Sequence, residues 1–204
     1  MIAVGLAALA GFVDSHAFLQ LGGFFVSFMS GNTTRLGTGT IDTLAAVLVP
    51  AGLIALFVAG VMAGTLFARL AGVGPPGIMA LVTALLALSA GLAAAGRPNA
   101  AMAMLAVAMG AENGVFVRNG EVSIALTYVT GALVKLGRAL AAALLGGDRW
   151  GWVWHLLLWL GLASGAALGA VSYLAIGLDG LWIAAAGSAA LSLALRHVAR
   201  PDPA

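Results

Sequence analysis

The sequence predicts an all-α integral membrane protein, a bundle of helices that cross a lipid bilayer several times. Of its 204 residues, 62% are hydrophobic and 8% are charged, whereas a soluble domain carries about 25% charged residues. So few polar side chains cannot cover a globular surface in water, and intrinsic disorder requires the opposite composition. The lipid bilayer is therefore the expected partner. A formal net charge of +2 is too small for a nucleic-acid-binding face.

The charged residues are spaced far enough apart for helices to cross the bilayer between them. No charge lies between Asp42 and Arg69, between Arg69 and Arg97, or between Arg149 and Asp179. A crossing needs about 20 apolar residues, and these Ala-, Leu- and Gly-rich runs lack the alternation typical of strands. Glycine, proline and asparagine clusters separate eight segments. They are 1–20, 24–40, 43–71, 76–96, 99–118, 122–146, 152–176 and 180–198.

An internal repeat divides the chain into halves. Three landmarks recur in the same order: Ser30–Gly37 with Thr130–Gly137, Gly11–Asp14 with Gly110–Asn113, and Gly60/Gly64 with Gly161/Gly165. The offsets are 100, 99 and 101 residues. We therefore expect one transmembrane domain over 1–204, with repeats at 1–97 and 98–200 and a short polar tail at 201–204. Coincidence in a chain so rich in glycine and alanine is the alternative.

The number of crossings decides how the two repeats are oriented. Segments 24–40 and 122–146 are the polar ones, and we expect them to be short or broken within the membrane. Six full spans then remain, and the repeats are inverted; if both polar segments cross, there are eight spans and the repeats are parallel. Either arrangement puts seven basic residues on one side and two on the other. The positive-inside rule therefore predicts cytoplasmic N- and C-termini at a bacterial inner membrane.

Polar residues in the predicted spans are candidates for a substrate-binding site. Asp14 interrupts the first apolar segment, where an ionisable group costs about 2.5–3.5 kcal/mol and usually faces protein or water. Hydroxyls at Ser27, Ser30 and Thr34, a glycine and a cation follow on one predicted helix face, and the pattern recurs in the second half. The candidates are Asp14, Ser30, Gly31, Asn32, Thr34, Arg35, Glu112, Asn113, Thr127, Thr130, Gly131 and Lys135. Structural hydrogen bonding and close helix packing are the alternative explanation.

The acidic and basic candidates suggest buried ion pairs. Asp14 and Glu112 supply one acid per half, and Arg35 and Lys135 one cation per half. Unpaired charges would be costly in the membrane, and a proton or an ionic substrate could break a pair. His16 is expected to be a packing residue rather than a metal ligand.

Motifs of other protein classes are missing from the sequence. It contains no GxxxxGK[ST] phosphate loop, no HExxH metal motif, no GxSxG nucleophile motif and no cysteine. We therefore expect neither an enzyme nor a bound metal or cofactor.

Two ordered motifs resemble those of a known family. Gly11-Phe12-Val13-Asp14, Phe18–Val26 and Met29–Gly37 are similar to the first signature of the YoaK family of bacterial membrane proteins, and Leu126–Gly131 with Leu136-Gly137 to its second. The resemblance covers nearly the whole chain. It implies a small polytopic inner-membrane protein of about six transmembrane segments, suspected of transport, with an unknown substrate. It implies no reaction and no site residues.

Together these features predict a secondary transporter or permeation protein with a polar site between the two repeats. The two cations favour an anionic small solute, and Asp14 or Glu112 could exchange a proton. The alternative is a non-transporting scaffold, or a module that binds lipid or protein, in which the same residues are structural. The small-residue faces permit a homodimer.

Overall fold

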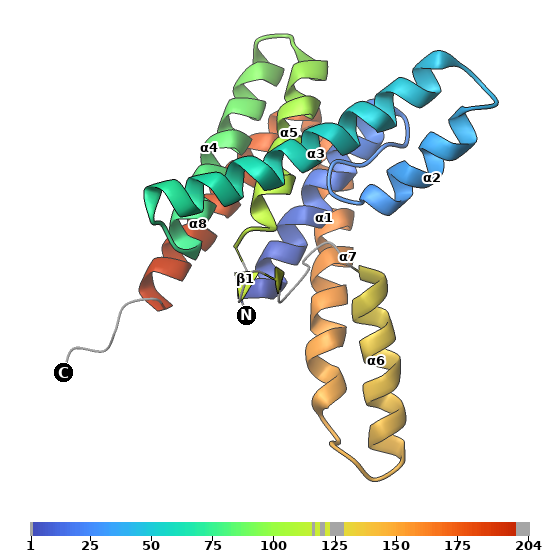
Figure 1. Ribbon diagram of the computed structural model, residues 1–204, viewed down its shortest axis with the longest axis vertical. Coiled ribbons are helices and arrows are strands. Elements are labelled where there is room, and N and C mark those ends of the chain that lie inside the picture. The colour runs from blue at the N-terminus through green and yellow to red at the C-terminus, as the bar shows by residue number, and fades with distance from the viewer. Residues whose placement is uncertain (1, 116, 119–120, 123–128, 199–204) are drawn as a thin grey trace.

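The computed structural model describes residues 2–115, 117–118, 121–122 and 129–198. Within these residues the chain is almost entirely helical (Figure 1). The helices are α1 (Ile2–Leu21), α2 (Met29–Gly39), α3 (Leu44–Ala71), α4 (Pro75–Ala94), α5 (Pro98–Glu112), α6 (Val129–Leu144), α7 (Gly151–Ile176), the 3-10 helix η1 (Gly177–Gly180) and α8 (Leu181–Val198). Two short antiparallel strands, β1 (Val117–Arg118) and β2 (Glu121–Val122), lie between α5 and α6.

The predicted all-α class is confirmed, and four stretches are long and apolar enough to cross a membrane. They are Ile2–Leu21, Leu44–Ala71, Pro75–Ala94 and Gly151–His197, the last of which contains α7 and all but the final residue of α8. Local signals set the helix ends where the sequence predicts breaks. The Thr43 hydroxyl oxygen accepts a hydrogen bond of 3.2 Å from the Ala46 amide at the start of α3. Prolines begin α4 and α5, where a missing amide hydrogen carries no penalty.

Three predicted segments differ from the observed helices. Segment 99–118 was expected to be helical throughout, but α5 ends at Glu112 and β1 follows. Segment 24–40 begins with five residues that are not helical, and segment 122–146 begins with β2 rather than a helix. The break at residues 24–28 has the apolar sequence Phe-Phe-Val-Ser-Phe, so composition alone does not reveal it.

Glycine faces join helices that are distant in the sequence. The buried residues of α7 are Gly161, Gly165 and Gly169, and they pack on α1 from Val4 to Phe12 in the same order. The two helices therefore run in the same direction. A Cβ atom on Gly165 would overlap the Ala8 carbonyl oxygen, so the backbones touch directly. In the same way, Gly60 and Gly64 of α3 pack on α5, and these two helices are also parallel.

The remaining long helix, α4, packs against α5 and α8. The Ser192 hydroxyl donates to the Pro76 carbonyl oxygen (3.2 Å), and Thr83 and Ser188 share a hydrogen bond of 2.8 Å. These contacts pair the start of α4 with the end of α8, so the two are antiparallel. Thus α1, α4 and α7 run in one direction and α3, α5 and α8 in the other (Figure 1).

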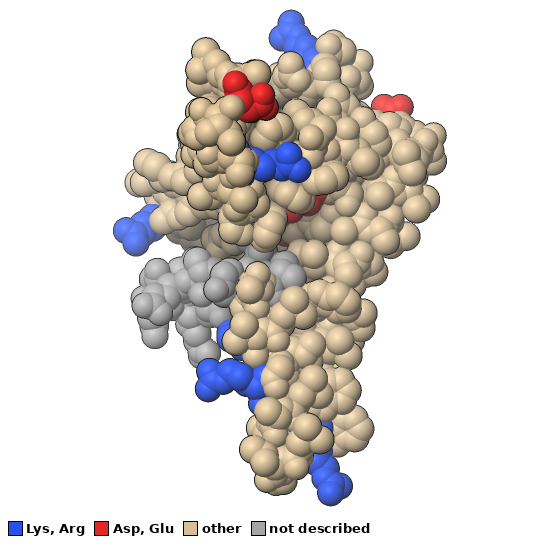
Figure 2. All heavy atoms as spheres, turned by 90° about the vertical axis from the view of Figure 1, so that its right-hand side faces the viewer, with Lys and Arg blue, Asp and Glu red and all other residues tan. Residues whose placement is uncertain are grey.

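The core lies among α1, α4, α5 and α8. Its largest fully buried apolar side chains include Leu6, Met79, Leu86, Met102, Leu105, Met109 and Leu181. In contrast, α3 and α7 expose many large apolar side chains, such as Met62 and Leu168. On the face shown in Figure 2, the few charged side chains are separated by broad areas of uncharged residues. Such a surface suits contact with lipid rather than water.

Each of α3 and α7 also packs against the short helix that precedes it. The hairpins α2–α3 and α6–α7 extend from opposite ends of the central helices (Figure 1). This arrangement leaves space between α6–α7 and the segment that joins α1 to α2, where the candidate site lies.

Candidate substrate-binding cavity

The chain turns back into the bundle after α1. Gly22 and Gly23 have φ angles of +70° and +109°, a conformation that side chains with a Cβ rarely adopt. The Gly23 amide donates to the Phe18 carbonyl oxygen (2.7 Å) and closes the helix. Residues 24–28 then return along α1 to Asp14, which lies seven residues, or about 10 Å, before the helix end. We call residues 24–28 the broken segment.

Asp14 holds the broken segment against α1. Its Oδ1 atom accepts hydrogen bonds from the amides of Val26 and Ser27, both at 2.8 Å. The Ser27 hydroxyl donates to Oδ2 at 2.5 Å. These three donors satisfy a group that would otherwise be costly in the membrane. The same hydrogen bonds satisfy the amides of Val26 and Ser27, which have no helical partner because these residues are not part of a helix.

Asn32 fixes the other side of the same segment. Its side chain is fully buried; Nδ2 donates to the Phe25 carbonyl oxygen (2.6 Å), and Oδ1 accepts from the Phe25 amide (3.0 Å). An amide side chain can donate and accept in this way, whereas a carboxylate can only accept. Asp14 and Asn32 therefore act together: one binds residues 26 and 27, and the other binds residue 25.

A cavity of about 600 Å³ lies beside the broken segment. It is lined by α1, the broken segment, α6 and α7, and therefore by residues from both halves of the chain. Most of the wall is apolar or aromatic. The lining residues are Gly11, Asp14, Ser15, Phe18, Leu19, Phe25, Ser27, Phe28, Thr130, Leu133, Leu162, Ala166 and Ala170. A small-molecule site of this kind combines an apolar wall with a few placed polar groups.

Four polar side chains face this cavity, namely Asp14, Ser15, Ser27 and Thr130. Ser15 donates to the Ala166 carbonyl oxygen on α7 (2.7 Å). Thus Asp14 and Thr130 are the predicted site residues that the structure brings together, one from each half. The aromatic wall of Phe18, Phe25 and Phe28 is not among the predicted site residues, although these rings contact one another in sequence order.

The other candidates on α2 and α6 are not among the lining residues. Ser30, Thr34, Arg35 and Lys135 are exposed, and Gly31 packs on the rings of Phe25 and Phe28. The Thr34 hydroxyl donates to the Ser30 carbonyl oxygen within α2 (3.2 Å). Gly131 is partly buried on α6, and Thr127 lies outside the described residues. The single stripe expected for Ser27, Ser30 and Thr34 is incorrect, because α2 begins only at Met29.

The predicted ion pairs are not formed among the described residues. The Arg35 guanidinium lies 5.3 Å from the centroid of the Phe24 ring, and the hydrogen bonds to Asp14 come from Val26 and Ser27. Glu112 is 1% exposed at the end of α5, and neither of its carboxyl oxygens has a hydrogen-bond partner in this part of the chain. The Asn113 side chain donates to the Met109 carbonyl oxygen (2.9 Å).

Long apolar helices around a partly polar cavity define the chain as a polytopic transmembrane protein. Residues 2–194 match the family described as "Protein of unknown function (DUF1275)", and the chain belongs to this family. The resemblance to YoaK proteins, which are members of it, is thereby confirmed. The chain is 33% identical to a UPF0700 transmembrane protein of Rhizobium meliloti (strain 1021), over 98% of its own length and 87% of that protein. No solved structure matches.

Proposed function

We propose that this protein is a secondary transporter or permeation protein of the bacterial inner membrane, built from two inverted repeats. The observation that carries the proposal is the cavity between the halves, which is lined by a broken membrane segment. Backbone without regular structure is tolerated at membrane depth where it is buried in protein or lines a cavity. Secondary transporters commonly use such discontinuous segments at the junction of their repeats.

The helix contacts support a repeat within one transmembrane domain. Gly60 meets Val107 as Gly165 meets Ala8, and Gly64 meets Ala111 as Gly169 meets Phe12. The offset is 99 residues between α1 and α5, as in the sequence comparison, but 105 residues between α3 and α7. By these contacts Gly60 corresponds to Gly165, whereas the sequence comparison aligns it with Gly161.

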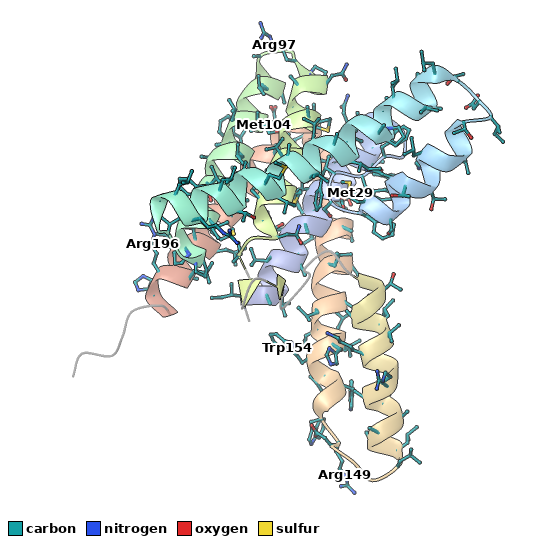
Figure 3. All side chains as sticks on the ribbon, viewed as in Figure 1. Met29, Arg97, Met104, Arg149, Trp154 and Arg196 are labelled. Atoms are coloured by element: carbon teal, nitrogen blue, oxygen red, sulfur yellow. The ribbon has the colours of Figure 1, made fainter. Side chains whose placement is uncertain are left out.

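Helix directions favour six crossings and inverted repeats. The first, third and fourth helices of one half (α1, α3, α4) run opposite to their counterparts in the other (α5, α7, α8). In this arrangement α2 and α6 do not cross the membrane. Arg97 lies at one end of the bundle and Arg149 at the tip of the α6–α7 hairpin (Figure 3). Seven basic residues then share the side of both termini, which the positive-inside rule makes cytoplasmic.

The lining of the cavity favours an amphipathic solute. Its rings and aliphatic side chains would contact an apolar body, and Asp14 with its neighbouring hydroxyls would contact a polar or cationic end. The anionic substrate expected from the sequence rested on Arg35 and Lys135, and neither cation lines the cavity. That basis for an anionic solute is therefore lost.

A scaffold role is the second candidate, because Asp14 and Asn32 bond mainly to the protein's own backbone, and Asp14 also to the Ser27 hydroxyl. Such satisfied groups are expected of structural residues as well as of a binding site. In a scaffold, the cavity would hold a lipid chain or a partner's side chain and would transport nothing.

Ligand screening of the purified protein in lipid nanodiscs separates these candidates. A solute that binds the folded state at 100 times its Kd raises the free energy of unfolding by about 2.7 kcal/mol and therefore raises Tm. We expect Ala170→Phe, which fills the cavity, to abolish the shift, and Ala167→Phe, on the exposed face of α7, to retain it. The hit should then cross the membrane of proteoliposomes. A broad panel without a hit, or a hit without flux, would favour the scaffold.

A further inference from the structure

Glu112 stands apart from every other described carboxyl group in the protein. It is 1% exposed, in the last turn of α5, and both carboxyl oxygens lack a hydrogen-bond partner among the described residues. A buried carboxylate without a partner costs several kcal/mol. The group is therefore stable here as a neutral acid, which carries a proton.

Asp14 presents the opposite environment. It has three hydrogen-bond donors from the broken segment, which suit a charged carboxylate. Asp14 lies on α1, which contacts α5, the helix that carries Glu112, so a charge on either carboxyl acts on the other through a medium of low dielectric. Two carboxylates on helices that contact each other within an apolar bundle repel, so charging both carries a penalty. Their environments therefore divide the roles: one remains charged, and the other carries the proton.

Among the described side chains, no ionisable group on the helices packed against α5 offsets this charge. The helices that pack on it are α1, α3 and α4. Helix α4 contains no ionisable side chain, and Arg69 of α3 is exposed near the end of that helix. On α1, His16 directs its Nδ1 atom to the Phe12 carbonyl oxygen and packs beside Gly180, away from Asp14.

We propose that Glu112 is a proton-binding site, and that its protonation sets how firmly Asp14 holds the broken segment. Loss of the proton to water leaves a second negative charge on the helix that contacts α1. Repulsion between the two carboxylates then weakens the bonds from Asp14 to Val26 and Ser27, which form one wall of the cavity. The link to transport rests on the proposed function, whereas proton binding itself does not. Within a transporter, this site would couple solute movement to protons.

The test is thermal unfolding in nanodiscs from about pH 5 to about pH 9, for the wild type and Glu112→Gln. Glutamine keeps the shape of the neutral acid but cannot release a proton. The folded wild type retains a proton that the unfolded chain loses, so rising pH should lower its stability. We expect its Tm to fall relative to Glu112→Gln by about 3 °C per pH unit. Asp42→Asn, which removes an exposed carboxyl, should follow the wild type.

Infrared spectra supply a second measurement. The band of a protonated carboxylic acid should be present in the wild type at neutral pH and reduced in Glu112→Gln. If Glu112→Gln does not fold, Glu112→Leu replaces it, with the same expected loss of pH dependence. The proposal would be overturned if the curves of Tm against pH for the wild type and Glu112→Gln were parallel and the infrared band were unchanged. A Tm at high pH that rises with Na⁺ but not with choline would also overturn it, because the site would then bind Na⁺ rather than a proton. Proton binding without solute flux would count against transport and leave the Glu112 site intact.

Discussion

At the scale of single residues, Asp14 and Asn32 have a structural role, because both side chains form hydrogen bonds with backbone groups. Between them they bind the amides of residues 25, 26 and 27 and the carbonyl of residue 25. These are backbone groups of the broken segment, which no helix satisfies. The cavity wall therefore depends on two side chains.

Asp14→Ala should destabilise the protein strongly. The substitution leaves the amides of Val26 and Ser27 and the Ser27 hydroxyl without their acceptor. Each unsatisfied buried group costs about 1–3 kcal/mol, so we expect a loss of about 3 kcal/mol, measured as a lower Tm in nanodiscs. Thr38→Ala, which removes an exposed hydroxyl bonded within its own helix, should change stability by less than about 0.5 kcal/mol. Equal Tm values for both variants would contradict the anchoring role.

The sequence identified Asp14 and Asn32 as important, but not what they bind. Their partners are backbone groups of residues 25–27, and the side chains at those positions carry no signal for this contact. The spacing of Ser27, Ser30 and Thr34 matched a helical period, and this match concealed the break before Met29. Arg35 and Lys135 align in the sequence, but both are exposed. Alignment of charges does not predict which of them line a cavity.

At the scale of elements, glycine faces determine which helices pair. The buried positions of α7 are three glycines spaced four residues apart, so the contact with α1 depends on backbone approach rather than on side-chain interlocking. The sequence predicts the helices α1, α3, α4, α7 and α8 to within two residues of their observed ends. It does not predict the end of α5, because Val115, Phe116 and Val117 continue the apolar run past Asn113 and no proline marks the break.

Gly165→Ala and Gly60→Ala should weaken equivalent helix contacts. In each case the new methyl group overlaps a carbonyl oxygen of the partner helix, at Ala8 or at Val107. Overpacking of this kind costs about 1–3 kcal/mol, which thermal or chemical unfolding in nanodiscs would measure. Gly52 of α3 has open space around it, so Gly52→Ala should leave Tm unchanged or raise it slightly. If all three variants unfold alike, direct backbone contact is not what joins these helices.

At the scale of the whole molecule, six crossings and eight crossings differ in the placement of two loops. The α2–α3 loop contains Asp42, and the α6–α7 loop contains Arg149. Inverted repeats place these loops on opposite sides of the membrane, whereas parallel repeats place both on the same side. Charge counts gave seven against two in either arrangement, and for this reason the sequence did not decide between them.

Single-cysteine labelling decides the topology. The natural chain contains no cysteine, so Asp42→Cys and Arg149→Cys each introduce one thiol without background. We expect a membrane-impermeant thiol reagent added to intact spheroplasts to label Asp42→Cys but not Arg149→Cys. Permeabilised membranes should label both, which controls for accessibility. Equal protection of the two positions in intact spheroplasts would support eight crossings.

The pairing of α1 with α7 and of α5 with α3 has a consequence for biogenesis. As the nascent chain leaves the ribosome, α1 enters the membrane long before α7 is synthesised. The face of α1 that packs on α7 is therefore in contact with lipid for most of the synthesis. Neither half can form these interfaces alone, because α1 of the first half packs on α7 of the second and α5 of the second half packs on α3 of the first. Two polypeptides divided at Gly96 should therefore find each other in one membrane and restore the bundle, while either fragment alone should be degraded.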